Sequence, residues 1–309
     1  MTAKGVPRIS ILVAVDDELL DPRAWYLALN NQTLPASDYE VLVLDSSHFT
    51  GHQSAFNQFR DEGLLGSHIS FHRTKRGGRA LALNQGIELA GSNVIVFLGD
   101  DCLVPLNFAE AHLRFHEQNP AKESVAIGCA LVPEEFRTHF VEWLEESGRQ
   151  WGVPHRADMV TVPPEFFYAA NASVKRELLE LAGRWDERFP HHAWDDFEYG
   201  ERLRAVGMRA EFLPDAPVQH IHRVDLPDRE KSMRLAGVAA RVYETIHPGG
   251  HRRSRSLKRG ERAHELRIAL AQIRSRITRS DRAMQKWWKC RLDAAFAEGY
   301  RQSATENKI

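Results

Sequence analysis

Residues 78–101 read GRALALNQGIELAGSNVIVFLGDD and join a helix-like segment to a strand-like one. Residues 79–90 have helical spacing and are followed by a glycine, a common helix terminator. Residues 94–98 form an apolar run, which is the pattern of a buried strand. The stretch therefore predicts one helix–strand step of an α/β sheet, with Asp100 and Asp101 directly after the strand.

The same alternation extends towards the N-terminus. Strand-like runs occupy residues 9–15, 39–44 and 68–72, and helix-like segments lie between them at 22–31 and 53–61. Strand–helix repetition of this kind predicts a Rossmann-like, mostly parallel sheet with helices on both faces. Because such sheets bind ligands beyond the carboxyl ends of their strands, a site is expected at those ends.

Carboxylates follow three of the predicted strands. Asp16 and Asp17 follow the first strand, Asp45 follows the second, and Asp100 with Asp101 follows the fourth. Carboxylates that converge in this way repel one another unless a cation or hydrogen-bond donors lie among them. The pattern therefore predicts a divalent metal ion at the carboxyl edge of the sheet.

The remaining sequence is less regular. Helices are expected at residues 174–182 and 195–206, and strands that extend the sheet at 210–213 and 218–221. From about residue 248 the chain is charged and almost free of β-branched runs, and its pattern is helical. We therefore expect one α/β catalytic domain over residues 1–247 and a C-terminal helical extension over residues 248–309.

Composition bears on the class of protein. The chain carries 41 basic and 42 acidic side chains, so its charge gives no reason to expect a nucleic-acid partner. Three widely spaced cysteines fit a reduced, cytoplasmic protein. No apolar run approaches the ~20 residues of a membrane helix, so any membrane contact is expected to be peripheral. The basic stretch 251–259 is either a solvated linker or a contact for anionic headgroups or a phosphorylated acceptor.

The order and spacing of these features resemble the family-2 group of inverting glycosyltransferases, which have the GT-A fold. The resemblance covers roughly residues 8–225, and its main features are Arg79, Asn84-Gln85-Gly86-Ile87, Gly99-Asp100-Asp101 and Trp194-Asp195-Asp196. Two departures stand out. Leu98 occupies a place where the family usually has a leading carboxylate, and Ala14-Val15-Asp16-Asp17 replaces the usual Pro-Thr-Tyr-Asn.

The resemblance implies a metal at the donor side of the site. Asp101 would ligate Mn²⁺ or Mg²⁺, which bridges the diphosphate, and Asp100 would take ribose hydroxyls or support the ligand. The metal neutralises charge on the departing nucleoside diphosphate. His220 either completes this metal site or is a packed histidine with no such role.

Other residues are expected to bind the nucleotide sugar. By the resemblance, Asp45 accepts the imide N–H of uracil and Arg79 contacts the base or a phosphate. Val15 ends the first strand and Asp17 lies in the loop after it, where a further contact to the nucleotide sugar is expected. The alternatives are a strand-end turn for Asp45 and a solvated helix residue for Arg79.

The acceptor side is implied by the second acidic pair. Asp196 occupies the general-base position and would take the proton of the acceptor hydroxyl as it attacks the anomeric carbon, which inverts that carbon. Trp194, Asp195, Trp185 and His192 are expected on the acceptor side. The alternative is that the two aspartates only cap a helix, whose N-terminal dipole favours them.

These roles predict a metal-dependent inverting glycosyltransferase with a nucleotide diphosphate sugar as donor, UDP being the commonest choice in the family. The acceptor is a glycan, a lipid-linked molecule or a small molecule. A nucleotidyltransferase is an alternative, although that class normally has a Gly-rich basic loop after the first strand and this chain has none. A non-catalytic scaffold is a third possibility, against which Asp101 and Asp196 argue.

The C-terminal extension contains a basic, aromatic helical segment, AMQKWWKCRL, at residues 283–292. We expect this segment to pack on the catalytic domain or on a second subunit, or else to lie on a membrane surface. A homo-oligomer or a peripheral membrane contact would then form through the C-terminal helices.

Overall fold

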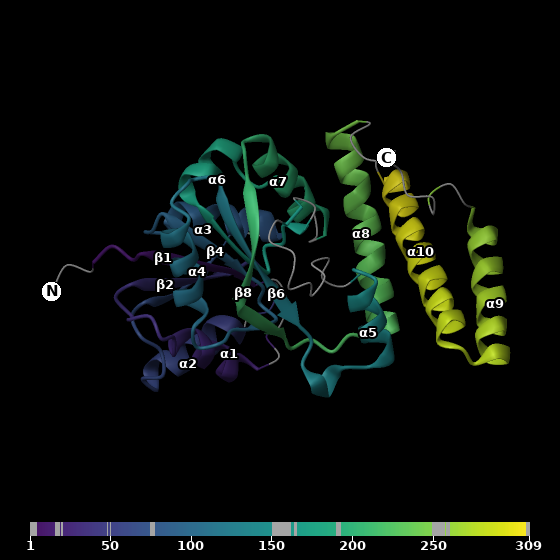
Figure 1. Ribbon diagram of the computed structural model, residues 1–309, viewed down its shortest axis with the longest axis horizontal. Helices are drawn as coiled ribbons and strands as arrows, with labels where there is room; N and C mark the ends of the chain where they lie inside the picture. Colours follow the sequence, from purple (N-terminus) through teal and green to yellow (C-terminus); the bar gives the residue numbers. More distant parts are fainter. Residues whose placement is uncertain are drawn as a thin grey trace. The chain divides into compact units, whose positions relative to one another are not determined.

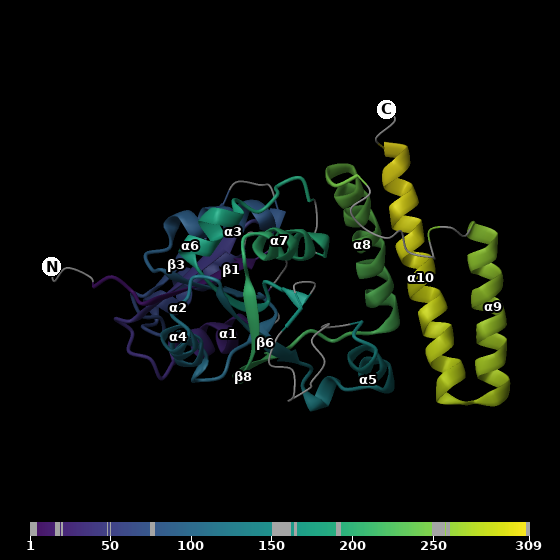
Figure 2. The ribbon, with the colours of Figure 1, turned by 45° about the horizontal axis from the view of Figure 1, so that its top comes forward.

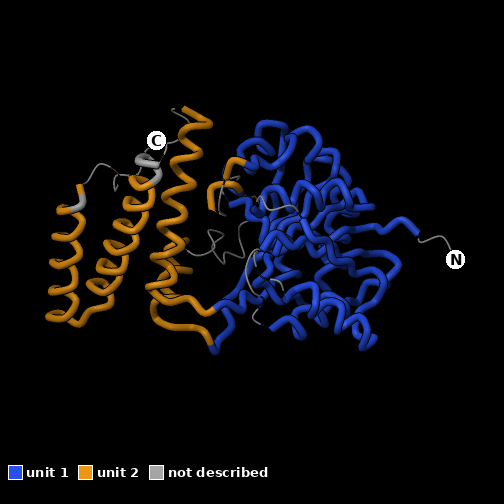
Figure 3. Tube along the Cα trace, turned by 180° about the vertical axis from the view of Figure 1, so that it is seen from behind, with its two compact units in different colours: residues 1–135, 151–187, 196–222 blue, residues 136–150, 188–195, 223–309 orange. Residues whose placement is uncertain are grey.

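The structure is a computed structural model that describes residues 5–15, 19, 21–47, 49, 51–74, 78–149, 162, 163, 166–189, 193–248, 257 and 260–306. The chain divides into two compact units (Figure 3). Unit 1 comprises residues 1–135, 151–187 and 196–222, and unit 2 comprises residues 136–150, 188–195 and 223–309. Each unit is described by itself.

Among the described residues, unit 1 contains one sheet of eight strands in the order β3-β2-β1-β4-β7-β6-β8-β5 (Figure 1). The strands are β1 (Ile9–Val15), β2 (Tyr39–Asp45), β3 (Ile69–Arg73), β4 (Val94–Leu98), β5 (Cys102–Leu103), β6 (Ser124–Leu131), β7 (Asn171–Lys175) and β8 (Arg209–His220). The first four pair in parallel, as predicted. Strand β7 is antiparallel to β4 and β6, and β5 is antiparallel to β8, so the sheet is mixed.

Helices cover both faces of this sheet (Figure 2). Side chains of α1 (Pro22–Asn30), α2 (Gly51–Asp61) and α4 (Phe108–Gln118) form one apolar core with β1 residues such as Ile9 and Val13. Side chains of α3 (Gly78–Leu89), α6 (Arg176–Ala182) and α7 (Trp194–Ala205) form the other with Leu12 and Ala14. Alternate residues of β1 therefore point into different cores, and all of β1 is buried.

The second half of the sheet differs in detail from the sequence prediction. Residues 210–213 and 218–221 were expected as two strands but lie in or next to the single strand β8. Residues 174 and 175 end β7, and α6 begins at Arg176. Strand β6 and helix α4 are additional elements that the sequence pattern did not reveal.

Unit 2 is helical in its described part. Its helices are α5 (His139–Glu146), α8 (Leu226–Ile246), α9 (Glu261–Thr278) and α10 (Asp281–Glu306), and a short 3₁₀ helix, η1 (Glu134–Phe136), spans the end of unit 1 and the start of unit 2. Helix α10 contacts both α8 and α9 (Figure 1). No helix in the described ranges has both the length and the apolar character to cross a bilayer. The boundary expected between residues 247 and 248 stays a prediction.

The aromatic segment of α10 packs within unit 2. Trp288 is buried, and its ring centroid lies 5.1 Å from that of Phe140 and 5.4 Å from that of Trp143, both on α5. The guanidinium of Arg291 lies 5.6 Å from the centroid of the Trp287 ring. Trp288 therefore stabilises unit 2 from inside and is not presented to solvent.

Two glycines let α8 and α10 approach closely. A Cβ atom on Gly237 would meet the backbone of Phe296, and one on Gly299 would meet the carbonyl of Arg234. Gly299→Ala should therefore lower the free energy of unfolding of unit 2 by about 1–3 kcal/mol, because the helices must separate. Chemical denaturation followed by tryptophan fluorescence measures the effect. Gly260→Ala is the control, since nothing lies near that position; equal stability of the two variants would contradict the packing argument.

Candidate functional site

Two predicted metal ligands meet at one edge of the sheet. Asp101 lies in the turn after β4, and His220 ends β8. The antiparallel pairing of β5 with β8 sets Cys102 opposite His220, which brings the neighbouring Asp101 to the same place. His220 Nε2 lies 2.7 Å from Asp101 Oδ2. The His220 side chain is buried, whereas that of Asp101 is 37% exposed, so the pair has one open side.

The surroundings keep Asp101 ionised. Burial by itself would raise the pKa of Asp101, but the charge of His220 and hydrogen bonds from His220 and Cys102 outweigh it and lower the pKa to about 2. The thiol of Cys102 donates to Asp101 Oδ1 at 3.5 Å. Burial, together with the nearby Asp101 charge, raises the pKa of Cys102 well above its ordinary value, so the thiol keeps its proton. A carboxylate is therefore available at neutral pH.

The donor set fits a hard cation that needs few protein ligands. Asp101 offers a carboxylate oxygen, His220 an imidazole nitrogen, and Asp100 lies next to Asp101 in the chain. Mn²⁺ accepts both kinds of ligand, and such cations commonly complete their coordination with water and phosphate oxygens. Within the described ranges no cluster of three or more His, Cys, Asp or Glu side chains forms a closed metal centre. The residues thus suit a metal shared with a phosphate-bearing ligand.

Asp196, the predicted base, is held by Arg79. Both terminal nitrogens of Arg79 donate to Asp196 Oδ1 at 3.1 Å, and the amide of Ala169 donates to the same oxygen at 3.3 Å. The guanidinium of Arg79 also lies 5.7 Å from the ring centroid of Trp185, which suits a cation–π contact. Arg79 lies in the first turn of α3 and Asp196 in the first turn of α7, and both residues belong to unit 1.

A two-residue segment links this ion pair to the metal ligands. Ala169 donates its amide to Asp196, and the carbonyl of the next residue, Ala170, accepts the amide of Gly99 at 3.1 Å. Gly99 directly precedes Asp100 and Asp101. The predicted base and the predicted metal ligands therefore lie on either side of one short backbone segment within unit 1.

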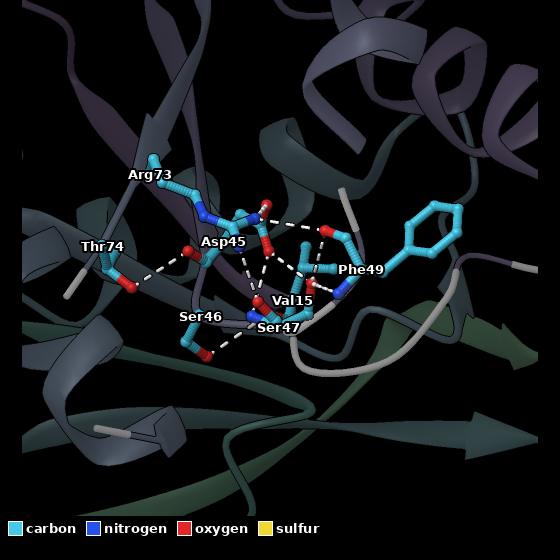
Figure 4. A network of polar contacts seen from close by, with 7 residues as sticks. All are labelled: Val15, Asp45, Ser46, Ser47, Phe49, Arg73 and Thr74. Atoms are coloured by element: carbon cyan, nitrogen blue, oxygen red, sulfur yellow. Dashed lines mark hydrogen bonds and ion pairs between the residues drawn. The ribbon is translucent and has the colours of Figure 1, made fainter. Parts of the chain in front are cut away.

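Asp45 ends β2, and its carboxylate already accepts hydrogen bonds from other residues of the chain (Figure 4). Its Oδ1 accepts the amide of Ser47 at 3.0 Å and the Ser47 hydroxyl at 2.7 Å, and its Oδ2 accepts from Arg73. The Asp45 side chain is fully buried. Val15 is also buried, and its carbonyl accepts the amide of Ser46 at 3.0 Å. A base contact by Asp45 stays a prediction and requires Arg73 to withdraw.

The predicted acceptor residues have different surroundings. Trp185 is buried in the core of unit 1, where it stacks on Tyr199 with ring centroids 4.1 Å apart. Asp195 is buried and accepts the amide of Ala193 at 2.9 Å, which is a capping contact. Trp194 and Tyr243, both in unit 2, have ring centroids 5.1 Å apart. The acceptor roles stay predictions, and Asp17 and His192 lie outside the described residues.

A buried polar chain under the site was not recognised from the sequence. The Asn171 side-chain amide donates to the carbonyls of Cys129, at 3.1 Å, and Ala216, at 2.8 Å, so its oxygen must accept from His112 Nε2 at 3.0 Å. His112 Nδ1 then accepts the Ser173 hydroxyl at 2.8 Å. These contacts tie β6, β7 and β8 to α4, and they give Asn171 a structural role.

The same chain continues to a second histidine. Because the Ser173 hydroxyl donates to His112, its oxygen accepts from His116 Nε2 at 2.9 Å. These hydrogen-bond directions require a neutral imidazole at His112, because its Nδ1 accepts a hydrogen bond from Ser173. Histidines four residues apart on α4 indicate a shared helix face, but their partners on β7 lie more than fifty residues away, so the sequence gives no sign of them.

Acid should destabilise unit 1 through these histidines. Burial lowers the pKa of His112 from 6.5 to about 4, and burial with the nearby Lys175 charge lowers that of His116 to about 3. At neutral pH both histidines are neutral in the folded state and mostly neutral in the unfolded state. Below about pH 6.5 only the unfolded chain takes up these protons, so stability falls by up to ~1.4 kcal/mol per pH unit for each histidine.

His116→Gln keeps a donor for Ser173 and removes one of the two titrations. Urea unfolding at pH 7 and pH 5 should therefore show a loss of stability that is smaller in the variant than in the parent chain by up to about 2 kcal/mol, the contribution of one such histidine. An unchanged loss between the two pH values would contradict the assignment of the acid sensitivity to this buried chain.

Comparisons with known proteins agree with one another. Residues 23–177 match the family described as Glycosyl transferase family 2. A validoxylamine A glucosyltransferase of Streptomyces hygroscopicus subsp. limoneus is 26% identical over 72% of this chain and 54% of its own length. The probable glycosyltransferase YdaM of Bacillus subtilis is 22% identical over 69% of this chain and 50% of its own. The chain thus spans about half the length of the curated relatives it matches.

Solved structures show the fold. The mannosyltransferase PcManGT of Pyrobaculum calidifontis, solved with GDP-Man and Mn²⁺, superimposes with a TM-score of 0.60 at 17% identity, covering 96% of this chain and 88% of that one. Residues 1–349 of S. aureus TarS give a TM-score of 0.52 at 14% identity, covering 96% and 91%. The predicted GT-A fold is confirmed.

Proposed function

Because the chain belongs to glycosyl transferase family 2, we propose that it transfers a sugar from a nucleotide diphosphate donor to an acceptor hydroxyl with inversion of the anomeric carbon. The observation that carries the proposal is the Ala169–Ala170 segment, which bonds to Asp196 on one side and to the loop of Asp100 and Asp101 on the other. Single displacement requires a base on one side of the bound sugar and a diphosphate-binding site on the other.

The proposed mechanism begins with the Arg79–Asp196 ion pair. While the pair is closed, both terminal nitrogens of Arg79 donate to Oδ1 of Asp196, so that oxygen is not free to meet an acceptor hydroxyl. A diphosphate offers Arg79 two or more charged oxygens, with which a guanidinium forms bidentate hydrogen bonds. In this proposal the donor draws Arg79 away from Asp196 and leaves the carboxylate free to accept a proton.

The chemical step then uses Asp196. Its carboxylate takes the proton of the acceptor hydroxyl while the hydroxyl oxygen forms a bond to the anomeric carbon. The bond from that carbon to the phosphate oxygen breaks on the opposite side, and the electron pair leaves with the nucleoside diphosphate. Asp101 and His220 would hold the metal, which when bound neutralises charge on that leaving group. The amide of Ala169 orients the Asp196 carboxylate throughout.

The donor is proposed to be a UDP-sugar, with Asp45 at the end of β2 as the uracil-binding residue. Use of Mn²⁺ is supported by its presence in two structural neighbours, PcManGT with GDP-Man and GalNAc-T7 with UDP and GalNAc. Because those two neighbours take different bases, the choice of base rests on Asp45, which must first exchange Arg73 for the ligand. The proposed acceptor is a glycan, a lipid-linked molecule or a small molecule.

Thermal denaturation of the full chain tests the proposal. UDP and GDP are added separately, each with Mn²⁺, with Mg²⁺ or with EDTA. A nucleotide at about 100 times its Kd stabilises the folded state by about 2.7 kcal/mol, which is a readily measured shift in Tm. The expected result is a larger shift with UDP than with GDP, and none in EDTA. Stabilisation by neither nucleotide would contradict the proposed donor class, and equal shifts in EDTA would contradict the metal.

A further inference from the structure

Helix α9 carries an apolar stripe that nothing in the described part of the chain covers. Its members, spaced four, three and four residues apart, are Leu266 (61% exposed), Leu270 (58%), Ile273 (55%) and Ile277 (75%). This spacing sets them on one face of a helix. The opposite face contains the buried residues His264, Ala271 and Ser275 and packs towards α10. One face of the helix is thus buried, and the apolar stripe lies on the other, exposed face.

Arginines border this stripe on both sides. An α-helix has about 3.6 residues per turn. This periodicity places Arg267 and Arg274 along one edge of the stripe, and Arg262 and Arg276 along the other. None of these four arginines forms an ion pair with a residue in the described part of the chain. The face therefore presents four apolar side chains between two rows of positive charge, and we call it the α9 face.

We propose that the α9 face docks on an anionic lipid surface. A helix with a Leu/Ile stripe bordered by arginines suits the boundary between acyl chains and headgroups, where the stripe enters the apolar region. The aliphatic stems of the exposed Arg262, Arg274 and Arg276 extend the apolar surface, while their guanidinium groups reach the phosphates of the headgroups. The face is a convex ridge on a single helix, which fits a deformable surface.

Charge argues against a second copy as the occupant. The stripe has the four-and-three spacing of a coiled-coil seam, and the four arginines fall at the positions that flank such a seam. Two α9 faces brought together would place arginines beside arginines with no acidic partner at these positions, which is destabilising. The inference depends on α9 alone and holds whether or not the chain transfers a sugar.

Flotation of the full chain with lipid vesicles tests the proposal. Vesicles of phosphatidylcholine with phosphatidylserine should carry the chain at low salt, and vesicles of pure phosphatidylcholine should carry far less. Arg274→Gln with Arg276→Gln, two exposed arginines on opposite edges of the stripe, should weaken partitioning about 25-fold, which corresponds to about 1 kcal/mol for each charge. Leu270→Gln with Ile273→Gln should weaken it by about tenfold or more.

The matched control is Leu106→Gln with Leu181→Gln, which removes two equally exposed leucines from unit 1 and should leave flotation unchanged. All four stripe and control positions are exposed, so the Tm of each variant should stay close to that of the parent. Failure of the chain to float with anionic vesicles, or equal flotation of the α9 variants, would overturn the proposal. So would a dimer in sedimentation velocity that the α9 substitutions abolish, because the occupant would then be a second copy.

Discussion

Asp196→Asn lowers the turnover of sugar transfer by about 10²–10⁴-fold, the range typical for loss of a general base. The amide cannot take the proton of the acceptor hydroxyl. The same substitution weakens the ion pair with Arg79, so that Arg79 no longer has to leave a carboxylate when a diphosphate binds. Donor binding should therefore be unchanged or several-fold tighter. Steady-state kinetics and calorimetric titration with nucleotide and Mn²⁺ measure the two effects separately.

Asp215→Asn is the matched control, because Asp215 is also paired with an arginine, Arg114, but lies exposed at the surface. Its turnover should equal that of the parent chain. If Asp196→Asn retains full turnover, Asp196 is not the base, and the capping role remains for it. If turnover and nucleotide affinity fall together, the substitution has damaged the fold of the site, which the Tm of the variant reveals.

Asp101→Asn removes the metal-dependent part of nucleotide binding. We expect nucleotide affinity in Mn²⁺ to fall by more than about 100-fold, since loss of only an outer partner of a metal ligand costs 10–100-fold. In EDTA the variant and the parent should bind equally weakly. His220→Asn should act in the same direction with a smaller loss, because one ligand of the pair remains. Calorimetric titration in Mn²⁺ and in EDTA measures each case.

The two variants report on different ends of the site, which makes their comparison informative. Asp101→Asn should lower nucleotide affinity, and Asp196→Asn should lower turnover at unchanged or improved affinity. A loss of affinity in Asp101→Asn that is equal in Mn²⁺ and in EDTA would contradict a metal role for this residue.

The first half of the fold could be predicted because its strands are buried on both faces. Strand β4 reads as an unbroken apolar run, β1 and β2 are interrupted only by Ser10 and Glu40, and all three were predicted to within a residue. Strand β8 was predicted as two pieces because Pro214 and Pro217 interrupt it. These prolines lie where the pairing of β8 with β6 shifts register, a place that tolerates proline.

Strand β6 was missed for a related reason. Gly128 breaks its apolar pattern, and glycine normally weakens a strand. In the structure a Cβ atom at Gly128 would collide with the side chain of Asn171, which crosses to the carbonyls of Cys129 and Ala216. The glycine therefore makes room for the buried polar chain, a reason that depends on β7 and cannot be read from β6 itself.

The convergence of strand-end residues was predictable, whereas the pairing of side chains was not. Parallel strands align their carboxyl ends, so Asp45 and Asp101 had to lie at one edge of the sheet. The contact between Arg79 and Asp196 joins residues 117 positions apart, and nothing local in either helix indicates it. The occupation of Asp45 by Arg73 likewise depends on the register of β2 with β3.

The most direct measurement follows Mn²⁺ by nuclear magnetic resonance. The central claim is that a metal held by Asp101 and the carboxylate of Asp196 serve one bound donor. With nucleoside diphosphate present, Mn²⁺ should broaden the amide signals of Ala169 and Asp196, and Asp101→Asn should restore them. Signals that stay sharp in the parent chain while nucleotide and Mn²⁺ are bound would place the metal elsewhere and contradict the proposed site.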